Sequence, residues 1–213
     1  MRDRNTSRRQ QGSELHPRGA GHDWIHDASG APQLAARSAA LCGARVVPQG
    51  GLDHGIWTVL RYLYPDADVP VTQLSIQPHL SPLHHYRVGE ALRPLTQEGV
   101  LIVGSGSLTH NLREFRGRPA GVEPDVREFQ QWMKASIDAQ DVAALLDYRR
   151  LAPSAVRAHP TDEHLLPLFV AMGAAGAGGA ERITDEVTFG VIAMDSYVFK
   201  PEPAGAPLHK AAA

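Results

Sequence analysis

The chain has 213 residues, 43% of them hydrophobic, which is enough for one domain with a sizeable core. Its 21 Lys and Arg residues nearly balance its 23 Asp and Glu residues, so the net charge of -2 gives no electrostatic reason to expect a nucleic acid or an anionic membrane as partner. The single cysteine, Cys42, excludes an intramolecular disulfide framework and a cysteine-based zinc cluster. It favours a reducing compartment, with the cytoplasm as the default.

The first 30 residues are rich in Arg, Gly, Ser and Gln and show no sustained apolar period. Such a composition predicts a disordered or poorly packed arm. The pattern changes at about residue 31, where we expect the folded domain to begin, and we expect it to extend to residue 200. Residues 32–42 predict a helix stopped by Gly43, and residues 44–48 predict a short strand.

Helices and strands are predicted to alternate over the next sixty residues. A helix starts after a possible Asp53 cap, with apolar residues at helical spacing, and residues 69–77 read as a strand. A second helix covers 81–99, and "VLIVGSG" (100–106) has the continuous apolar character of a strand covered on both faces. This alternation predicts an α/β fold with a mainly parallel or mixed central sheet and helices on both faces.

The remaining elements follow the same rules. Helices are predicted over 123–140, over 141–151 and over 161–176, the last capped by Thr161. Residues 188–200 return to strand character, and residues 201–213 predict a disordered tail.

Three of the eleven histidines lie at predicted junctions between elements. His110 follows a strand, and His54 and His164 lie in the first turns of predicted helices. In open parallel sheets, ligands bind outside the carboxyl ends of the strands, so we expect these three side chains to converge on one cleft. A helix N-terminus also favours the neutral imidazole, which can accept a proton or bind a metal. For each histidine alone, packing or solvent exposure is the alternative.

Other patterns in the chain are less specific. The glycines of "GSGSLTH" suggest a dinucleotide site, but the third glycine of that fingerprint is missing, and "GSGSL" does not match a hydrolase elbow. His84 and His85 are predicted to lie on the solvated face of a helix. His159, which precedes Pro160, could lie near His164, and its role is left open.

Three stretches, in this order, carry a family resemblance: "GLDHGIWTVLRYLYPDADVPVTQLSIQ", "GVLIVGSGSLTHNLREF" and "HPTDEHLLPLFVAMGAAG". They resemble the class III extradiol ring-cleavage dioxygenases, and within these the 4,5-DOPA dioxygenase-like branch. The resemblance covers about residues 31–200. It implies an enzyme that binds a small aromatic diol and O₂ and cleaves the ring next to the diol. A homo-oligomer is possible.

The resemblance also implies roles for the three histidines. His164 matches a metal ligand, and His110 matches an active-site histidine that is a metal neighbour or the acid/base for the catechol proton. His54 matches a further histidine near the bound substrate and O₂. Fe(II) is the implied metal, because an open ferrous centre can bind substrate and O₂ together, and Zn(II) occupies the site in some relatives.

The chain departs from the family at its start. A "GHGSP"-like turn and a strand ending in "SAHW" supply two metal-binding histidines in the family, and neither is present here. We therefore expect an N-terminally incomplete domain with weak metal binding and impaired ring cleavage. Three alternatives are open. His16, His22, His26 or another chain completes the site; or the protein is an inactive relative acting as a binding or scaffold protein; or it is a truncated or rearranged product that is barely folded.

Overall fold

The computed structural model describes residues 28–115 and 121–201. The chain divides into two compact units, residues 1–74 and 75–213, and each is described by itself. Most of the predicted N-terminal arm and of the predicted tail lies outside the described residues. No helix in the described ranges is long and apolar enough to cross a membrane.

The described part of the first unit, residues 28–74, contains two helices, α1 (Pro32–Cys42) and α2 (His54–Leu63). Gly43 ends α1 in the left-handed conformation, at a φ of 71°, which confirms the predicted glycine stop. The Asp53 carboxylate accepts a 2.8 Å hydrogen bond from the Gly55 amide, which confirms the predicted cap of α2. The predicted strand over 44–48 is not formed. Among the described residues, the predicted strand over 69–77 is reduced to a single parallel bridge between Gly30 and Val71.

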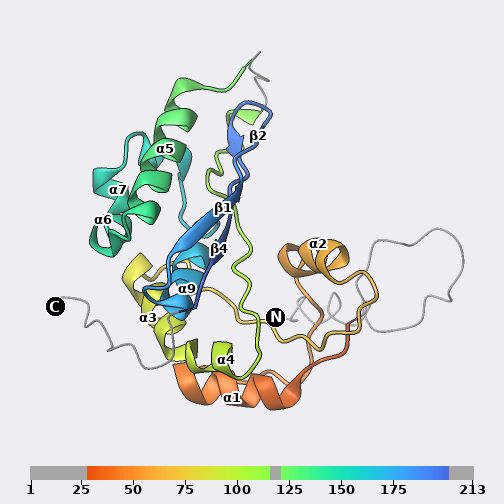
Figure 1. Cartoon of the computed structure of the whole chain (residues 1–213). Helices are drawn as coiled ribbons and strands as arrows, with labels where there is room; N and C mark the ends of the chain where they lie inside the picture. The colour runs from red at the N-terminus through yellow and green to blue at the C-terminus, as the bar shows by residue number, and fades with distance from the viewer. Residues whose placement is uncertain (1–27, 116–120, 202–213) are drawn as a thin grey trace, which may run out of the picture. The chain divides into compact units, whose positions relative to one another are not determined.

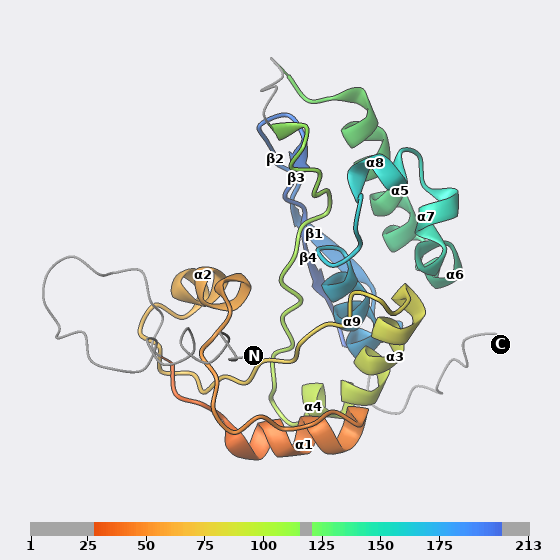
Figure 2. The ribbon, with the colours of Figure 1, turned by 180° about the vertical axis from the view of Figure 1, so that it is seen from behind.

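The second unit is organised around α3 (Pro82–Leu92) and α9 (Leu166–Ala175), which lie side by side in both ribbon views (Figures 1 and 2). Two glycines form this contact. A Cβ on Gly89 would lie 2.1 Å from the Val170 carbonyl oxygen, and one on Gly173 would lie 2.0 Å from that of Tyr86. Any side chain at either position would therefore push the helices apart.

Four further helices cover one side of α9: the long α5 (Pro124–Asp138) and the short α6 (Val142–Leu146), α7 (Tyr148–Leu151) and α8 (Ala155–Ala158). The largest side chains of the core come from α5, α6, α7 and α9 and are fully buried: Phe129, Met133, Leu145, Tyr148, Leu166 and Phe169. The short α4 (Pro94–Gln97) follows α3 directly. The predicted helix over 81–99 is thus two helices, and so is the one over 141–151.

Within residues 75–115 and 121–201, the strands of the second unit form two small antiparallel sheets. β1 (Ala180–Thr184) pairs with β4 (Ser196–Phe199), and β2 (Val187–Thr188) pairs with β3 (Ile192–Ala193). Residues 100–106 are not a strand, and Leu101 is 64% exposed rather than covered on both faces. The predicted central parallel sheet is therefore not confirmed. An apolar run becomes a strand only where a neighbouring strand accepts its backbone hydrogen bonds, and the described residues place none beside 100–106.

A candidate active site around His110 and His164

Two of the three predicted histidines lie against each other in the second unit. The rings of His110 and His164 are stacked, with centroids 3.4 Å apart and planes 16° from parallel. His110 belongs to the segment that follows Gly106, and His164 belongs to the turn before α9. The prediction that His164 lies in the first turn of a helix is wrong, because α9 begins at Leu166.

The predicted Thr161 cap is also wrong. The Thr161 hydroxyl donates a 2.8 Å hydrogen bond to the Glu163 carboxylate and does not contact the amides of α9, whose N-cap residue is Leu165. Pro167 within the first turn of the helix explains part of this difference. Proline has no N–H group and fixes its own backbone, so a helix can begin there without a side-chain cap.

The glycines before His110 bring the two segments together. A Cβ on Gly106 would lie 2.1 Å from the His164 carbonyl oxygen, and one on Gly104 would lie 2.4 Å from that of Pro167. The Ser107 amide donates a 2.9 Å hydrogen bond to the same His164 carbonyl. These glycines therefore allow a close approach between two stretches of backbone, and this accounts for the pattern without a bound phosphate.

The backbone that carries His110 is fixed by bonds to two other parts of the fold. The His110 amide donates a 2.8 Å hydrogen bond to the Ala158 carbonyl at the end of α8. The buried Thr109 hydroxyl donates to the Val191 carbonyl at 2.8 Å and accepts from the Ala193 amide at 2.7 Å. Because this hydroxyl both donates and accepts a hydrogen bond, Thr109, the residue before His110, is held against β3.

His159 is a buried neighbour whose role the sequence left open. Its side chain is fully buried against Phe129 and Tyr148, and its Nε2 donates a 2.7 Å hydrogen bond to the Leu108 carbonyl. Its Nδ1 has no hydrogen-bond partner among the described residues. Burial lowers the pKa of His159 to about 4, so the ring is neutral at pH 7. This residue ties the core to the His110 segment.

The electrostatic surroundings of His110 favour its neutral ring. Burial lowers the pKa of His110, the neighbouring His164 ring lowers it further, and the Glu163 carboxylate opposes both effects. The Glu163 carboxylate also lies 3.5 Å from Nδ1 of His164. The arrangement can accept a proton from an acidic hydroxyl and share the resulting charge with a carboxylate.

His54 belongs to the first unit and is the first residue of α2. Its Nδ1 lies 3.4 Å from the Asp53 carboxylate. Its convergence with His110 and His164 stays a prediction. The substitute ligands suggested by the sequence, His16, His22 and His26, lie outside the described residues.

The metal centre that the resemblance implies is not complete in the described residues. A metal binds the lone pair of an imidazole nitrogen in the plane of the ring. The nearly parallel planes of His110 and His164 prevent those lone pairs from converging on one ion. Within residues 28–115 and 121–201, no group of three His, Cys, Asp or Glu side chains is placed to hold a metal. The described donors therefore do not fit a complete site.

Two further observations concern residues outside the pair. The prediction of a solvated face is wrong for His85, which is 2% exposed. Its Nδ1 donates to the Ser81 carbonyl at 2.9 Å, and its Nε2 accepts from the Gln77 amide at 3.2 Å.

A cavity of about 280 Å³ lies between α3, α5, α9 and β4. None of the candidate histidines lines it.

Comparison with known proteins places this arrangement in a family. The model of the catalytic LigB subunit of aromatic ring-opening dioxygenase matches residues 6–200, and the chain belongs to that family of class III extradiol dioxygenases. Among individual proteins, it is 42% identical over 185 residues to a 4,5-DOPA dioxygenase extradiol of Beta vulgaris, covering 84% of this chain and 69% of that one.

Two further relatives carry the same printed description, 4,5-DOPA dioxygenase extradiol. The chain is 37% identical to a 4,5-DOPA dioxygenase extradiol of Mirabilis jalapa, covering 82% of this chain and 68% of the relative. It is 33% identical to one of Escherichia coli K12, covering 76% and 62%. A crystal structure of an uncharacterized protein from Escherichia coli K12 is similar, with a TM-score of 0.72 and 31% identity over 81% of this chain and 74% of that chain.

Proposed function

We propose that this chain is an extradiol dioxygenase that opens the aromatic ring of a catechol-type substrate with O₂. The observation that carries the proposal is the stacking of His110 and His164, two residues far apart in the sequence, within a member of the ring-opening dioxygenase family. In this reaction the carbon–carbon bond next to the diol breaks and both atoms of O₂ enter the product. The catechol supplies the four electrons that reduce O₂, so no further reductant is needed.

The proposal gives the histidines distinct tasks. His110 accepts a proton from a catechol hydroxyl, a task that suits a neutral imidazole near pH 7. His164, beside Glu163, is a metal ligand or holds the second oxygen of the diol. His54 is proposed to contact substrate or O₂. The relatives' printed names suggest a substituted catechol such as DOPA as the substrate.

A divalent metal belongs to the proposal as the family's cofactor, with Fe(II) favoured over Zn(II) because only iron can take part in electron transfer to O₂. The resemblance assigns His164 and His110 as its ligands, but their stacked rings cannot both bind one ion, so His164 alone is its proposed ligand in the described residues. A catechol is a small molecule, and the near-zero net charge agrees with the absence of nucleic acid or membrane from the proposed partners. The reducing, cytoplasmic setting suggested by the single Cys42 is part of the same proposal.

A second candidate function rests on the incomplete donor set. With two imidazoles whose planes are nearly parallel and no three-donor group in the described ranges, the protein is a candidate for a catalytically inactive relative that binds an aromatic ligand or acts as a scaffold. Metal affinity falls steeply as ligands are lost, because each one contributes to the chelate.

The two candidates are separated by metal uptake and turnover. Purified full-length chain is titrated with Fe(II) without oxygen, then mixed with aerated buffer and catechol or DOPA while oxygen uptake and the yellow ring-opened product are followed. His110→Ala and His164→Ala are the test variants. His79→Ala, which removes an exposed histidine from a coil of the same unit, is the matched control.

We expect weak Fe(II) binding that His164→Ala abolishes, and slow turnover that both test variants abolish. The control should retain both. Turnover that survives both test variants would show that the stacked pair is not the active site. A wild-type chain that binds catechol but neither takes up Fe(II) nor consumes oxygen would replace the enzyme with the second candidate.

A further inference from the structure

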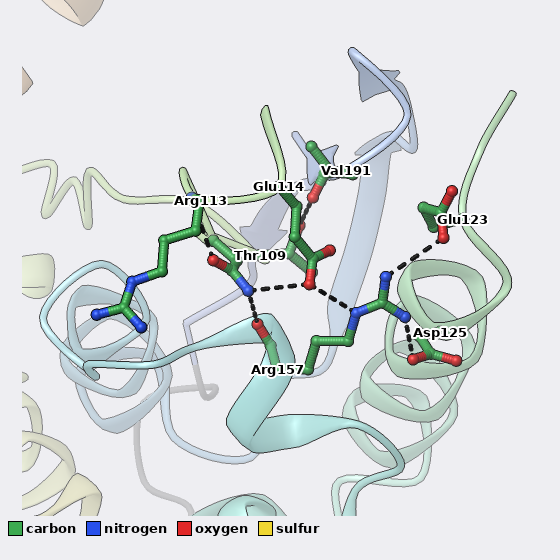
Figure 3. A network of polar contacts seen from close by, with 8 residues as sticks. Thr109, Arg113, Glu114, Glu123, Asp125, Arg157 and Val191 are labelled. Atoms are coloured by element: carbon green, nitrogen blue, oxygen red, sulfur yellow. Dashed lines mark hydrogen bonds and ion pairs between the residues drawn. The ribbon is translucent and has the colours of Figure 1, made fainter. Parts of the chain in front are cut away.

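One arginine next to the His110 segment has three carboxylate partners. Nε of Arg157 donates to the Glu114 carboxylate at 2.7 Å, and Nη2 donates to that of Glu123 at 3.3 Å. Nη1 forms an ion pair with Asp125 (Figure 3). We call these four residues the Arg157 clamp. Because the planar guanidinium carries five N–H donors in a fixed fork, it can hold several carboxylates at once, as a lysine cannot.

The clamp joins three parts of the fold. Arg157 lies in α8, and Glu114 lies in the turn that follows His110, residues 111–115, which we call the His110 turn. Glu123 and Asp125 are the N-cap residue and a first-turn residue of α5. A single side chain therefore ties the His110 turn and the start of α5 to the same short helix.

The link from the clamp to His110 passes through Asn111. The Asn111 amide nitrogen donates to the Glu114 carboxylate at 3.1 Å and to the Arg157 carbonyl oxygen at 2.8 Å. On the other side, the His110 amide donates to the Ala158 carbonyl at 2.8 Å. The His110 amide and the Asn111 side chain are thus bonded to two consecutive residues of α8, Ala158 and Arg157, and the Arg157 side chain also holds Glu114 in the turn that follows.

The charges of the clamp do not balance, since three carboxylates surround one guanidinium. Without Arg157 these carboxylates repel one another. Asp125 stays favoured by the N-terminus of α5, where negative charge is stabilised. Glu114 lies in a turn, and within the described residues its side chain keeps the bond from Asn111. Loss of the arginine should therefore release the His110 turn more than α5.

The Arg157 side chain is 38% exposed, and ion pairs at that exposure contribute little to global stability. Arg157 should therefore affect the position of the His110 turn more than the stability of the whole fold. We propose that Arg157 is a positioning residue for His110, which holds the His110 turn against α8 so that the imidazole stays stacked on His164. This inference rests on the proposed function for its catalytic meaning, and its structural part stands independently.

The test compares four variants of the full-length chain with wild type. Arg157→Met removes the charge and the fork, Arg157→Lys keeps only the charge, and Glu114→Gln weakens the arm that reaches the His110 turn. Arg150→Met is the matched control, because Arg150 of α7 forms an ion pair with Asp147, the N-cap residue of that helix, and among the described residues has no bond to the His110 turn.

Amide hydrogen exchange followed by mass spectrometry is the first readout, and it requires neither metal nor turnover. In Arg157→Met, peptides covering 107–111 should exchange about tenfold faster or more, which corresponds to a local opening of that segment. Peptides of α9 should be unchanged. Arg157→Lys and Glu114→Gln should show intermediate rates, and Arg150→Met should match wild type. Equal exchange of 107–111 in Arg157→Met and wild type would overturn the inference, as would equal acceleration in α9.

Kinetics form the second readout. If the wild-type chain turns over catechol, Arg157→Met should lose roughly tenfold or more in kcat with KM within about twofold, because a displaced catalytic group costs rate more than binding. Partial recovery in Arg157→Lys supports positioning. An unchanged kcat together with faster exchange would overturn the link to catalysis. A wild-type chain without turnover but with the expected exchange pattern would remove the proposed function and leave the clamp in place.

Discussion

Replacing His159 by glutamine should remove a large part of the acid sensitivity of this protein. The folded state holds His159 with a pKa of about 4, against 6.5 for an exposed imidazole. Below pH 6.5 the unfolded chain takes up a proton that the folded chain refuses until about pH 4. Above pH 6.5 the His159 ring is neutral in both the folded and the unfolded chain, so its burial causes no pH-dependent loss of stability. As the pH falls from 6.5 to 4, the free energy of unfolding decreases progressively, because only the unfolded chain binds a proton at His159.

The magnitude follows from the pKa difference. A shift of 2.5 units corresponds to a loss of about 3 kcal/mol at pH 4, of which roughly 2 kcal/mol is lost by pH 5. Burial is the main cause, and the charged neighbours do not cancel it: Asp162 favours the protonated ring, whereas the His110 and His164 rings oppose it. Arg149 donates to the His159 carbonyl, so its side chain faces the backbone of this residue.

Urea unfolding between pH 7 and pH 5, followed by circular dichroism, tests the prediction. His159→Gln keeps an amide N–H in place of Nε2, which donates to the Leu108 carbonyl, and cannot titrate. Its free energy of unfolding should fall by about 2 kcal/mol less than that of wild type over this interval. His79→Gln, at an exposed coil position, controls for the loss of an imidazole. Parallel losses in wild type and His159→Gln would refute the reasoning.

Three further substitutions test the packing and capping of the second unit. Gly173→Ala should lower the free energy of unfolding by about 3 kcal/mol, measured by urea unfolding, because its Cβ would meet the Tyr86 carbonyl; a loss under about 1 kcal/mol would mean that the helices separate freely. Gly106→Ala should displace His164 and shift the ring NMR signals of His110, and unchanged signals would contradict the close approach. Ser81→Ala should cost about 1 kcal/mol, because Ser81 caps α3, and an unchanged urea midpoint would argue against that cap.

Local signals in the sequence predicted local structure well. The Gly43 stop, the Asp53 cap and the extent of α5 depend on residues a few positions apart, whose chemistry is visible in the sequence. The strand expected over 100–106 failed because a strand needs a distant partner, and that partner is not a property of the apolar run. His85 was misplaced for a similar reason, since its burial comes from α3 packing on other elements.

The candidate site was predicted in part. His110 was selected because it follows a predicted strand and His164 because it lies in the first turn of a predicted helix. The structure brings the two together, although the described residues do not form the expected sheet edge. His159 and Arg157 were missed as contributors. The dipeptide His159-Pro160, close to His164, was the one local signal for the first. No local signal indicated Arg157, because its three carboxylate partners are 32 to 43 residues away in the sequence.

The glycine contact between α3 and α9 has a consequence for how the second unit folds. Gly89 and Gly173 are separated by more than eighty residues, so closing the chain between them costs considerable conformational entropy before any contact is gained. A backbone-to-backbone contact offers no flexible side chain that could stabilise a partly docked pair. Sliding either helix by one residue would bring a side chain into a space that holds only hydrogen. The two helices therefore dock in a single register or not at all, and α5 to α8, which pair with near neighbours, are free to assemble first.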